Sequence, residues 1–244
     1  MFILAFFLLR IRRMASTFAD PVNLGAFLLA VFLVSWHRGK GIICVLMAIG
    51  MLLTVSKGAW LGVSVFFCVY AYFYWPKPAF YMMLGVSGLI GFVFLIYAYK
   101  TSANSVFLHI SGLTAAFRGL IKHPLGSGLG SNSVLAKQFS GFSSNAEVTE
   151  TGLGMIISQL GIFGLIIYVV YFKKLIDTSL HIENKKDAVL VLSLLLSVIL
   201  NIFFNEVALS PNTCAVYFLI TGYYAAKVKD SREVQGNVKS YAQN

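Results

Sequence analysis

The chain has 244 residues, of which 58% are hydrophobic and 11% charged, and its mean hydropathy is +0.80. Soluble domains carry about 25% charged residues, so this chain has too little charge to coat a soluble surface. The composition therefore predicts an integral membrane protein. The formal charge of +10 does not indicate a nucleic-acid partner, because Lys and Arg are scattered between apolar runs and form no basic stripe. In a membrane protein such an excess is typical of cytoplasmic loops and of anionic lipid or phosphate partners.

The chain begins with the apolar run MFILAFFLL (1–9), which Arg10, Arg12 and Arg13 follow. Positive charges after an apolar run are the reverse of a secretory signal. At a rise of about 1.5 Å per residue, this run covers about half of a ~30 Å hydrocarbon core. We interpret it as the second half of a transmembrane helix, and expect the chain to be N-terminally short.

Seven further apolar runs approach or reach the length that crosses a membrane. They predict an all-α, polytopic helical membrane protein with about 7–8 transmembrane segments and one long external loop. The expected spans are 22–37, 41–56, 59–75, 79–99, 152–172, 188–205 and 207–226. Four regions follow from them. These are N-terminal transmembrane helices (1–99, the first one partial), an external loop with an amphipathic helix (100–151), C-terminal transmembrane helices (152–226) and a polar, disordered cytoplasmic tail (227–244).

Lys and Arg in the short loops predict the orientation, because cytoplasmic loops are enriched in them. The loops 37–40, 75–78 and 172–187 and the tail all carry net positive charge or several lysines, and seven spans place them on one side. This side is expected to be the cytoplasm, which leaves the N-terminal arginines and the 100–151 loop outside. External arginines break the usual rule, so either the half-helix is inverted, or the helix count is wrong, or the arginines bind an anion. Lys57, Arg118 and Lys122 are expected on the same face, where Arg offers a planar fork to phosphate and Lys a point charge.

The first part of the external loop, residues 102–122, has apolar residues at roughly helical spacing and Arg118 near its end. This pattern predicts an amphipathic helix that lies on the membrane surface. The apolar positions are Val106, Ile110, Leu113, Phe117 and Leu120.

The stretch KHPLGSGLGSNS (122–133) follows this helix and has glycines at alternate positions. They are Gly126, Gly128 and Gly130, just after His123 and a proline that ends the helix. The stretch matches neither a Walker loop nor a dinucleotide fingerprint, and no strand precedes it. Two interpretations stay open, a flexible joint between helices and a backbone that contacts an anion.

Glu150 stands at the start of the helix that is expected from about residue 152. A carboxylate there is able to accept a proton from a hydroxyl, or to cap the positive end of the helix. No metal site is predicted. Cys44, Cys68 and Cys214 lie far apart within apolar runs, and the His residues of the loop lack a companion at metal-binding spacing.

Four stretches in this order resemble the O-antigen ligase/polymerase family of bacterial polysaccharide assembly. The first has an Arg, an S/T-x-F element and an Asp-Pro helix start; the second resembles the family's Ser-Arg-Gly-Ala turn. The third is similar to an Arg-bearing helix followed by His-Pro-Leu-x-G-x-G-x-G; the fourth is similar to a polar pair, an apolar run and E/Q-Leu-Gly-x-x-Gly. They are RRMASTFADPVNLGAFLL (12–29), TVSKGAWLGV (54–63), RGLIKHPLGSGLG (118–130) and TETGLGMIISQLGIFGLI (149–166).

The resemblance implies a multi-pass, metal-independent glycosyltransferase of the bacterial cytoplasmic (inner) membrane that needs no cofactor. Such an enzyme moves a glycan from an undecaprenyl diphosphate carrier to an acceptor on the outer face, during O-antigen, capsule or exopolysaccharide synthesis. The implied partners are this lipid-linked glycan, membrane lipids, a flippase and a chain-length regulator.

The resemblance also implies roles for individual residues. Arg13 and Arg118 would stabilise negative charge on the diphosphate leaving group, and Glu150 would act as a base or position the acceptor hydroxyl. Ligases carry a His where we align Glu150, which favours a polymerase. The remaining residues with an implied part in substrate binding are Arg12, Lys57 (where many members have Arg), His123, Gly126, Gly128 and Gly130. The alternatives are a ligase of the same family, a transporter or flippase for lipid-linked anions, and an inactive fragment.

Overall fold

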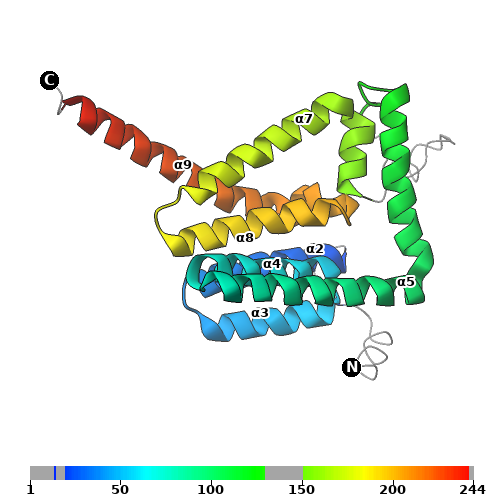
Figure 1. Ribbon diagram of the computed structural model, residues 1–244, viewed down its shortest axis with the longest axis horizontal. Coiled ribbons are helices and arrows are strands. Elements are labelled where there is room, and N and C mark those ends of the chain that lie inside the picture. The colour runs from blue at the N-terminus through cyan, green and yellow to red at the C-terminus, as the bar shows by residue number, and fades with distance from the viewer. Residues whose placement is uncertain (1–13, 15–19, 130–150, 242–244) are drawn as a thin grey trace.

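The computed structural model describes Met14 and residues 20–129 and 151–241, and every regular element in these ranges is helical (Figure 1). The prediction of an all-α fold is therefore confirmed for the described residues. The elements are α2 (Pro21–His37), α3 (Gly41–Thr54), α4 (Lys57–Tyr74), α5 (Lys77–Lys122), α7 (Gly152–Leu180), α8 (Lys185–Ile202), the short 3₁₀ helix η1 (Glu206–Leu209) and α9 (Pro211–Tyr241).

Helix α8 is the central element of the fold. Its sequence between residues 188 and 198 is apolar except for Ser193 and Ser197, and a helix of this kind is stable only where neighbours surround it. The structure buries almost all of this stretch, Leu194 and Leu195 included. Helices α2, α4, α7 and α9 all contact α8, so the core lies around this helix.

Local signals set where several helices begin. Asp20 accepts a hydrogen bond from the backbone N–H of Val22 (3.2 Å), and Pro21 occupies the first turn of α2. Thr151 accepts one from the N–H of Gly154 (3.1 Å) and starts α7. Asn184 does the same for Lys186 (3.0 Å) at the start of α8. Each cap satisfies a backbone donor that the first helical turn leaves without a partner.

The bundle has two ends, and we name each by a residue that lies there. The Lys57 end gathers the starts of α2, α4, α7 and α9 and the ends of α3 and α8. The His37 end gathers the tight connections 38–40, 75–76 and 181–184. In Figure 1, α2, α3, α4 and the first part of α5 run side by side between the two ends.

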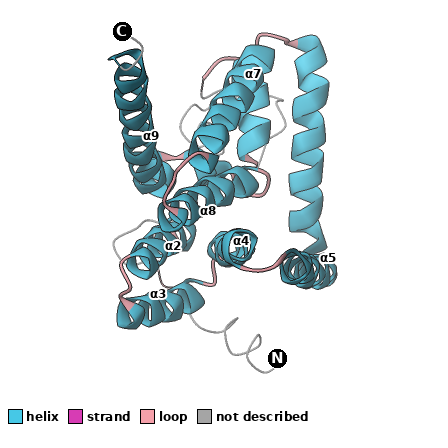
Figure 2. Ribbon diagram, turned by 60° about the vertical axis from the view of Figure 1, so that its left-hand side comes forward, coloured by secondary structure: helices cyan, strands magenta, loops and turns pink. Residues whose placement is uncertain are grey.

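Helix α5 is continuous through residue 100, so the predicted boundary between the fourth span and a separate amphipathic helix is wrong. The polar residues that follow Lys100 include no proline, so they do not interrupt the backbone hydrogen bonds. The helix bends instead. Figures 1 and 2 show a second arm that turns across the bundle and runs beside α7. Gly112 and Ala116 are buried on this arm, whereas Ile110 and Phe117 are exposed.

The C-terminal region also departs from its prediction. Helix α9 continues to Tyr241, so the expectation of a disordered tail from residue 227 is wrong over most of its length. Mixed charge and polarity were poor indicators here, because they are equally typical of a solvated helix. The partial helix expected over residues 1–9 lies outside the described residues.

Among the described residues, one helix is both long enough and apolar enough to cross a membrane, and it is α7 (Gly152–Leu180). Helices α2 and α3 and the stretch 77–93 are apolar but shorter. Helices α2 and α3 nevertheless coincide with predicted spans to within two residues.

Candidate functional site

The candidate site lies at the Lys57 end, where α3 passes into α4. Val55 adopts a left-handed conformation (φ 51°) and reverses the chain, and Lys57 then begins α4 with its side chain exposed. Ser56 is the N-cap residue between them, but its side chain makes no capping hydrogen bond. The turn thus presents a cation at the surface and directs a serine hydroxyl inwards.

The glycine stretch after α5 fits into a break in α7. Gly161 has φ 63° and ψ −152° and interrupts that helix. In an unbroken helix the N–H of Ile162 would donate to the carbonyl of Ser158. Here Ile162 donates to Pro124 (2.9 Å), and the Ser158 carbonyl accepts from Ser127 (2.8 Å). The loop therefore provides an acceptor for the Ile162 N–H and a donor for the Ser158 carbonyl, so neither backbone group is left without a hydrogen bond.

We name residues 124–128 with residues 158–162 the backbone clip. A third bond runs from the Gly128 N–H to the Gln159 carbonyl (3.1 Å). Gly126 and Gly161 both have positive φ, and a Cβ on either would overlap the backbone of the other segment. Glycine is required at both positions by conformation and by close approach.

The described part of the glycine stretch matches neither of its two interpretations. The N–H of Gly126 donates to the His123 carbonyl (2.9 Å) and that of Gly128 to Gln159. Both donors are directed to backbone acceptors, so they do not form an anion cradle. The segment is also no freely moving joint, because three bonds hold it to α7.

Cationic side chains precede the clip on the second arm of α5. Arg118 and Lys122 are exposed and lie one helical turn apart, and exposed His123 is the C-cap residue. Positive charge is favoured at this end of a helix by the helix dipole. The sequence from 100 to 129 contains no Asp or Glu, so local acids do not neutralise this group.

The structure does not bring all predicted residues together. Arg118 and His123 belong to the clip group, whereas Lys57 lies at the start of α4. The first segment of α7 separates the two groups (Figure 1), and from Gly152 to Gly161 it is about 14 Å long at 1.5 Å per residue.

Four predicted site residues, Arg12, Arg13, Gly130 and Glu150, lie outside the described residues. The described sequence neighbours of Arg13 and Glu150 are at the Lys57 end. The Met14 N–H donates to the Leu53 carbonyl (3.2 Å), next to the α3–α4 turn. Thr151 caps α7, and Gly152 donates to the Asn205 carbonyl (3.1 Å).

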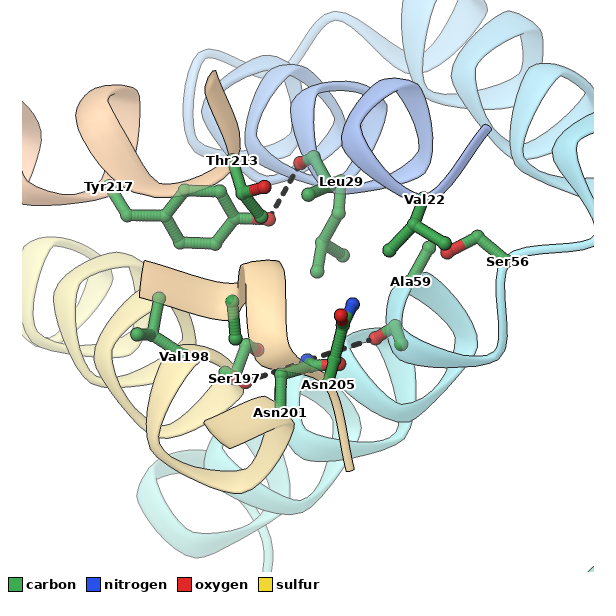
Figure 3. A pocket seen from close by; sticks show the side chains of 13 residues that line it. Val22, Leu29, Ser56, Ala59, Ser197, Val198, Asn201, Asn205, Thr213 and Tyr217 are labelled. Atoms are coloured by element: carbon green, nitrogen blue, oxygen red, sulfur yellow. Dashed lines mark hydrogen bonds between the residues drawn. The ribbon is translucent and has the colours of Figure 1, made fainter. Parts of the chain in front are cut away.

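A small pocket lies beneath the α3–α4 turn, where α2, α4, α8, η1 and α9 meet (Figure 3). Its volume is about 20 Å³, and a water molecule needs roughly 10–15 Å³ on this measure. Its polar wall comes from Ser56, Ser197, Asn201, Asn205 and Thr213. The pocket is too small for a sugar ring, so it is not itself a glycan site.

Most polar groups of this wall are paired. The Asn201 side-chain amide donates to the carbonyls of Ser197 (2.8 Å) and Gly58 (3.3 Å). Thr213 donates to the Asn23 side chain, and the Tyr217 hydroxyl donates to the Ala26 carbonyl (2.6 Å). Ser56 differs, since its side-chain oxygen is buried and has no hydrogen-bond partner among the described atoms. A buried hydroxyl in this state costs about 1–3 kcal/mol.

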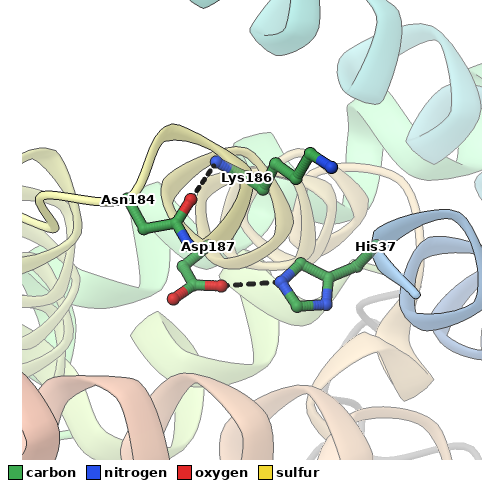
Figure 4. A network of polar contacts seen from close by, with 4 residues as sticks. All are labelled: His37, Asn184, Lys186 and Asp187. Carbon is green, nitrogen blue, oxygen red and sulfur yellow. Dashed lines mark hydrogen bonds and ion pairs between the residues drawn. The ribbon is translucent and has the colours of Figure 1, made fainter. Parts of the chain in front are cut away.

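A polar pair at the His37 end was missed by the sequence reasoning. His37 Nε2 lies 2.6 Å from a side-chain oxygen of Asp187, and the two side chains are 22% and 10% exposed (Figure 4). His37 is in the last turn of α2 and Asp187 in the first turn of α8, where each charge suits the helix dipole. The two residues are 150 positions apart in the sequence. The local sequence therefore shows an acid near a helix start but gives no sign that it pairs with His37.

No group of three or more His, Cys, Asp or Glu residues that could hold a metal ion occurs in the described part of the chain. The three cysteines are free. Comparisons with protein-family models, curated proteins and solved structures find no match for this chain. The inference about function therefore rests on the residues and their arrangement.

Proposed function

We propose that this chain is a membrane glycosyltransferase that polymerises glycan units carried on a polyprenyl diphosphate, with undecaprenyl diphosphate as the bacterial carrier. The proposal combines the sequence resemblance to the O-antigen ligase/polymerase family with the chemistry of the Lys57 end. Transfer from such a carrier releases a lipid diphosphate, so cations near the reacting bond would stabilise the developing negative charge.

One observation carries the proposal: exposed cationic side chains occur in two separate places, at the start of α4 and near the end of α5. Lys57 belongs to one group, and Arg118 and Lys122 to the other. A polymerase joins two glycans that each carry a lipid diphosphate, so it handles two anionic headgroups. Two cationic groups offer a place for each, whereas a ligase with a different acceptor has less need of the second.

Exposed apolar side chains support the membrane part of the proposal. Monomeric soluble proteins rarely expose contiguous apolar patches larger than a few hundred Å². Here the outward faces of three helices are apolar over much of their length, as expected for contact with lipid. They include Ile42, Val45, Leu46 and Ile49 on α3, Met82, Leu89, Phe92 and Val93 on α5, and Phe163, Ile167 and Val170 on α7.

The decisive experiment is turnover of a polyprenyl-diphosphate oligosaccharide by the purified full chain in proteoliposomes. Arg118→Ala is expected to lower turnover at least 10²-fold, as does removal of one group that stabilises transition-state charge. Arg13→Ala is expected to do the same. Lys173→Ala is the matched control, because this exposed cation lies towards the opposite end of α7. Normal product from Arg118→Ala and Arg13→Ala, in protein that inserts normally, would reject the proposal.

A transporter of lipid-linked anions is the second candidate, and the break in α7 favours it. Transporters use interrupted helices at their substrate sites. Here, however, the break lies nine residues after the start of the helix, at Gly161, where the clip occupies its backbone groups. Flipping of a fluorescent polyprenyl diphosphate by the purified chain, without any change in glycan length, would support this candidate over the polymerase.

A further inference from the structure

The pocket beneath the α3–α4 turn has no part in the proposed transfer, and the inference drawn from it does not depend on that function. A serine at the N-cap normally accepts a hydrogen bond from a backbone N–H in the first helical turn. Ser56 makes no such bond, although it is only 1% exposed. Figure 3 shows its hydroxyl and the side chain of Asn205 directed towards the same space.

The size and chemistry of the pocket limit what fits there. A volume of about 20 Å³ admits one water-sized group. The lining residues contain no carboxylate, and the positive end of α4 and Lys57 adjoin the pocket, which disfavours a cation. A water molecule both donates and accepts, so it suits a hydroxyl beside a side-chain amide.

We propose that this pocket is a binding site for one ordered water molecule, which is hydrogen-bonded to Ser56 Oγ and to the side chain of Asn205. The water satisfies the buried hydroxyl and links the N-cap of α4 to the segment before η1. It thereby holds the turn that presents Lys57. Buried polar groups without a protein partner are commonly satisfied by water in this way.

The direct test is an experimental structure of the full chain at a resolution that shows ordered water. The expected result is a density peak within hydrogen-bond distance of both Ser56 Oγ and the Asn205 side chain. An empty pocket, or a Ser56 hydroxyl that bonds a protein atom instead, would overturn the proposal.

Thermal unfolding in detergent gives an independent test with Ser56→Ala. Loss of a bridged hydroxyl is expected to lower the unfolding midpoint by about 2–4 °C, whereas removal of a dry, unpaired hydroxyl would leave it unchanged or raise it. The latter result would count against the water. Ser64→Ala is the matched control on the same helix, because the Ser64 hydroxyl donates to the Trp60 carbonyl (3.1 Å) outside the pocket.

The same assay distinguishes a water from a cation. The unfolding midpoint is expected to be equal in sodium, potassium and choline chloride at one ionic strength. A midpoint that rises in one alkali salt, and does so in the unchanged chain but not in Ser56→Ala, would assign the pocket to a cation and overturn the proposal.

Discussion

The two ends of the bundle are held together by different kinds of bond. At the His37 end an ionisable side-chain pair, His37 and Asp187, joins α2 to α8. At the Lys57 end the joining bonds come mainly from the backbone and from neutral amides and hydroxyls. They include the Gly152 to Asn205 bond and the Asn201 to Gly58 bond, and the backbone clip follows at the other end of the first segment of α7.

The ionisable side chains in these two regions have different roles, because one set joins helices and the other is exposed. His37 and Asp187 are partly buried and hydrogen-bonded to each other, so this pair contributes to the packing of two helices. Arg118 and Lys122 are exposed, and the clip beside them is built without them. Because backbone bonds hold the clip together, the cationic side chains beside it are not needed for packing and can contact an anionic ligand. Substitutions of the pair at the His37 end should therefore lower stability more than activity. Substitutions of the exposed cations should lower activity more than stability.

The largest effect on stability is expected from Gly161→Val. The new side chain would adopt a disfavoured positive φ and overlap the backbone of Pro124 and Gly126. We expect a loss of about 3 kcal/mol or more and release of the second arm, measured by thermal unfolding and by protease cleavage after α5. Gly88→Val is the control, because a Cβ there meets nothing within 4 Å. Equal unfolding midpoints for the two variants would mean that the clip is not closed in solution.

The next effect is expected from Asp187→Asn. Loss of the charged partner of His37 should cost about 2 kcal/mol with little change in turnover, because hydrogen bonds to charged groups contribute roughly 1.5–3 kcal/mol. Asp177→Asn, an exposed acid near the same end, should change stability by less than about 0.5 kcal/mol. A double-mutant cycle with His37→Ala measures the coupling. A coupling energy near zero would show that the pair does not hold the helices together.

A matched pair of helix caps compares the two ends directly. Thr151→Ala at the Lys57 end and Asn184→Ala at the His37 end each remove an N-cap hydrogen bond. Each should cost about 1 kcal/mol in chemical denaturation. Only Thr151→Ala should also lower glycan transfer, since only that cap adjoins the candidate site. Equal activity in the two variants would argue against a site at the Lys57 end.

The smallest effect on stability is expected from Lys57→Gln. A lysine in the first turn of α4 is disfavoured by the helix dipole, so its removal should change stability by no more than about 0.5 kcal/mol. Turnover should nevertheless fall, with a higher KM for the lipid diphosphate. Lys173→Gln serves as the control for loss of one positive charge. An unchanged KM in Lys57→Gln would remove this lysine from the site.

The positions of the helices could be predicted well from the sequence because they depend on local signals. Apolar runs and their breakers gave α2, α3 and α4 to within two residues of their observed ends; examples of breakers are Pro21 and the Pro76 turn. The same local logic failed where polarity changed without a breaker. Helix α5 passes through Lys100, and α9 passes through residue 227.

The candidate site was less predictable because its contacts are distant in sequence. The glycines of the 126–130 stretch signalled unusual backbone, but nothing local paired them with Gly161. His37 and Asp187 gave no local sign of each other, and Ser56 read as an ordinary turn residue. The predicted cations lie at accessible positions where the structure describes them, namely Lys57 and Arg118. The roles of Arg12, Arg13, Gly130 and Glu150 stay predictions.

The backbone clip also sets an order of events during synthesis. Chains emerge N-terminus first, and domains fold as their segments become available. The loop at 124–128 cannot form its bonds to α7 until residues 158–162 have been made. The second arm of α5 therefore stays without its bonds to α7 until more than thirty further residues have left the ribosome. A translational pause that holds residues 158–162 inside the ribosome would lengthen this wait.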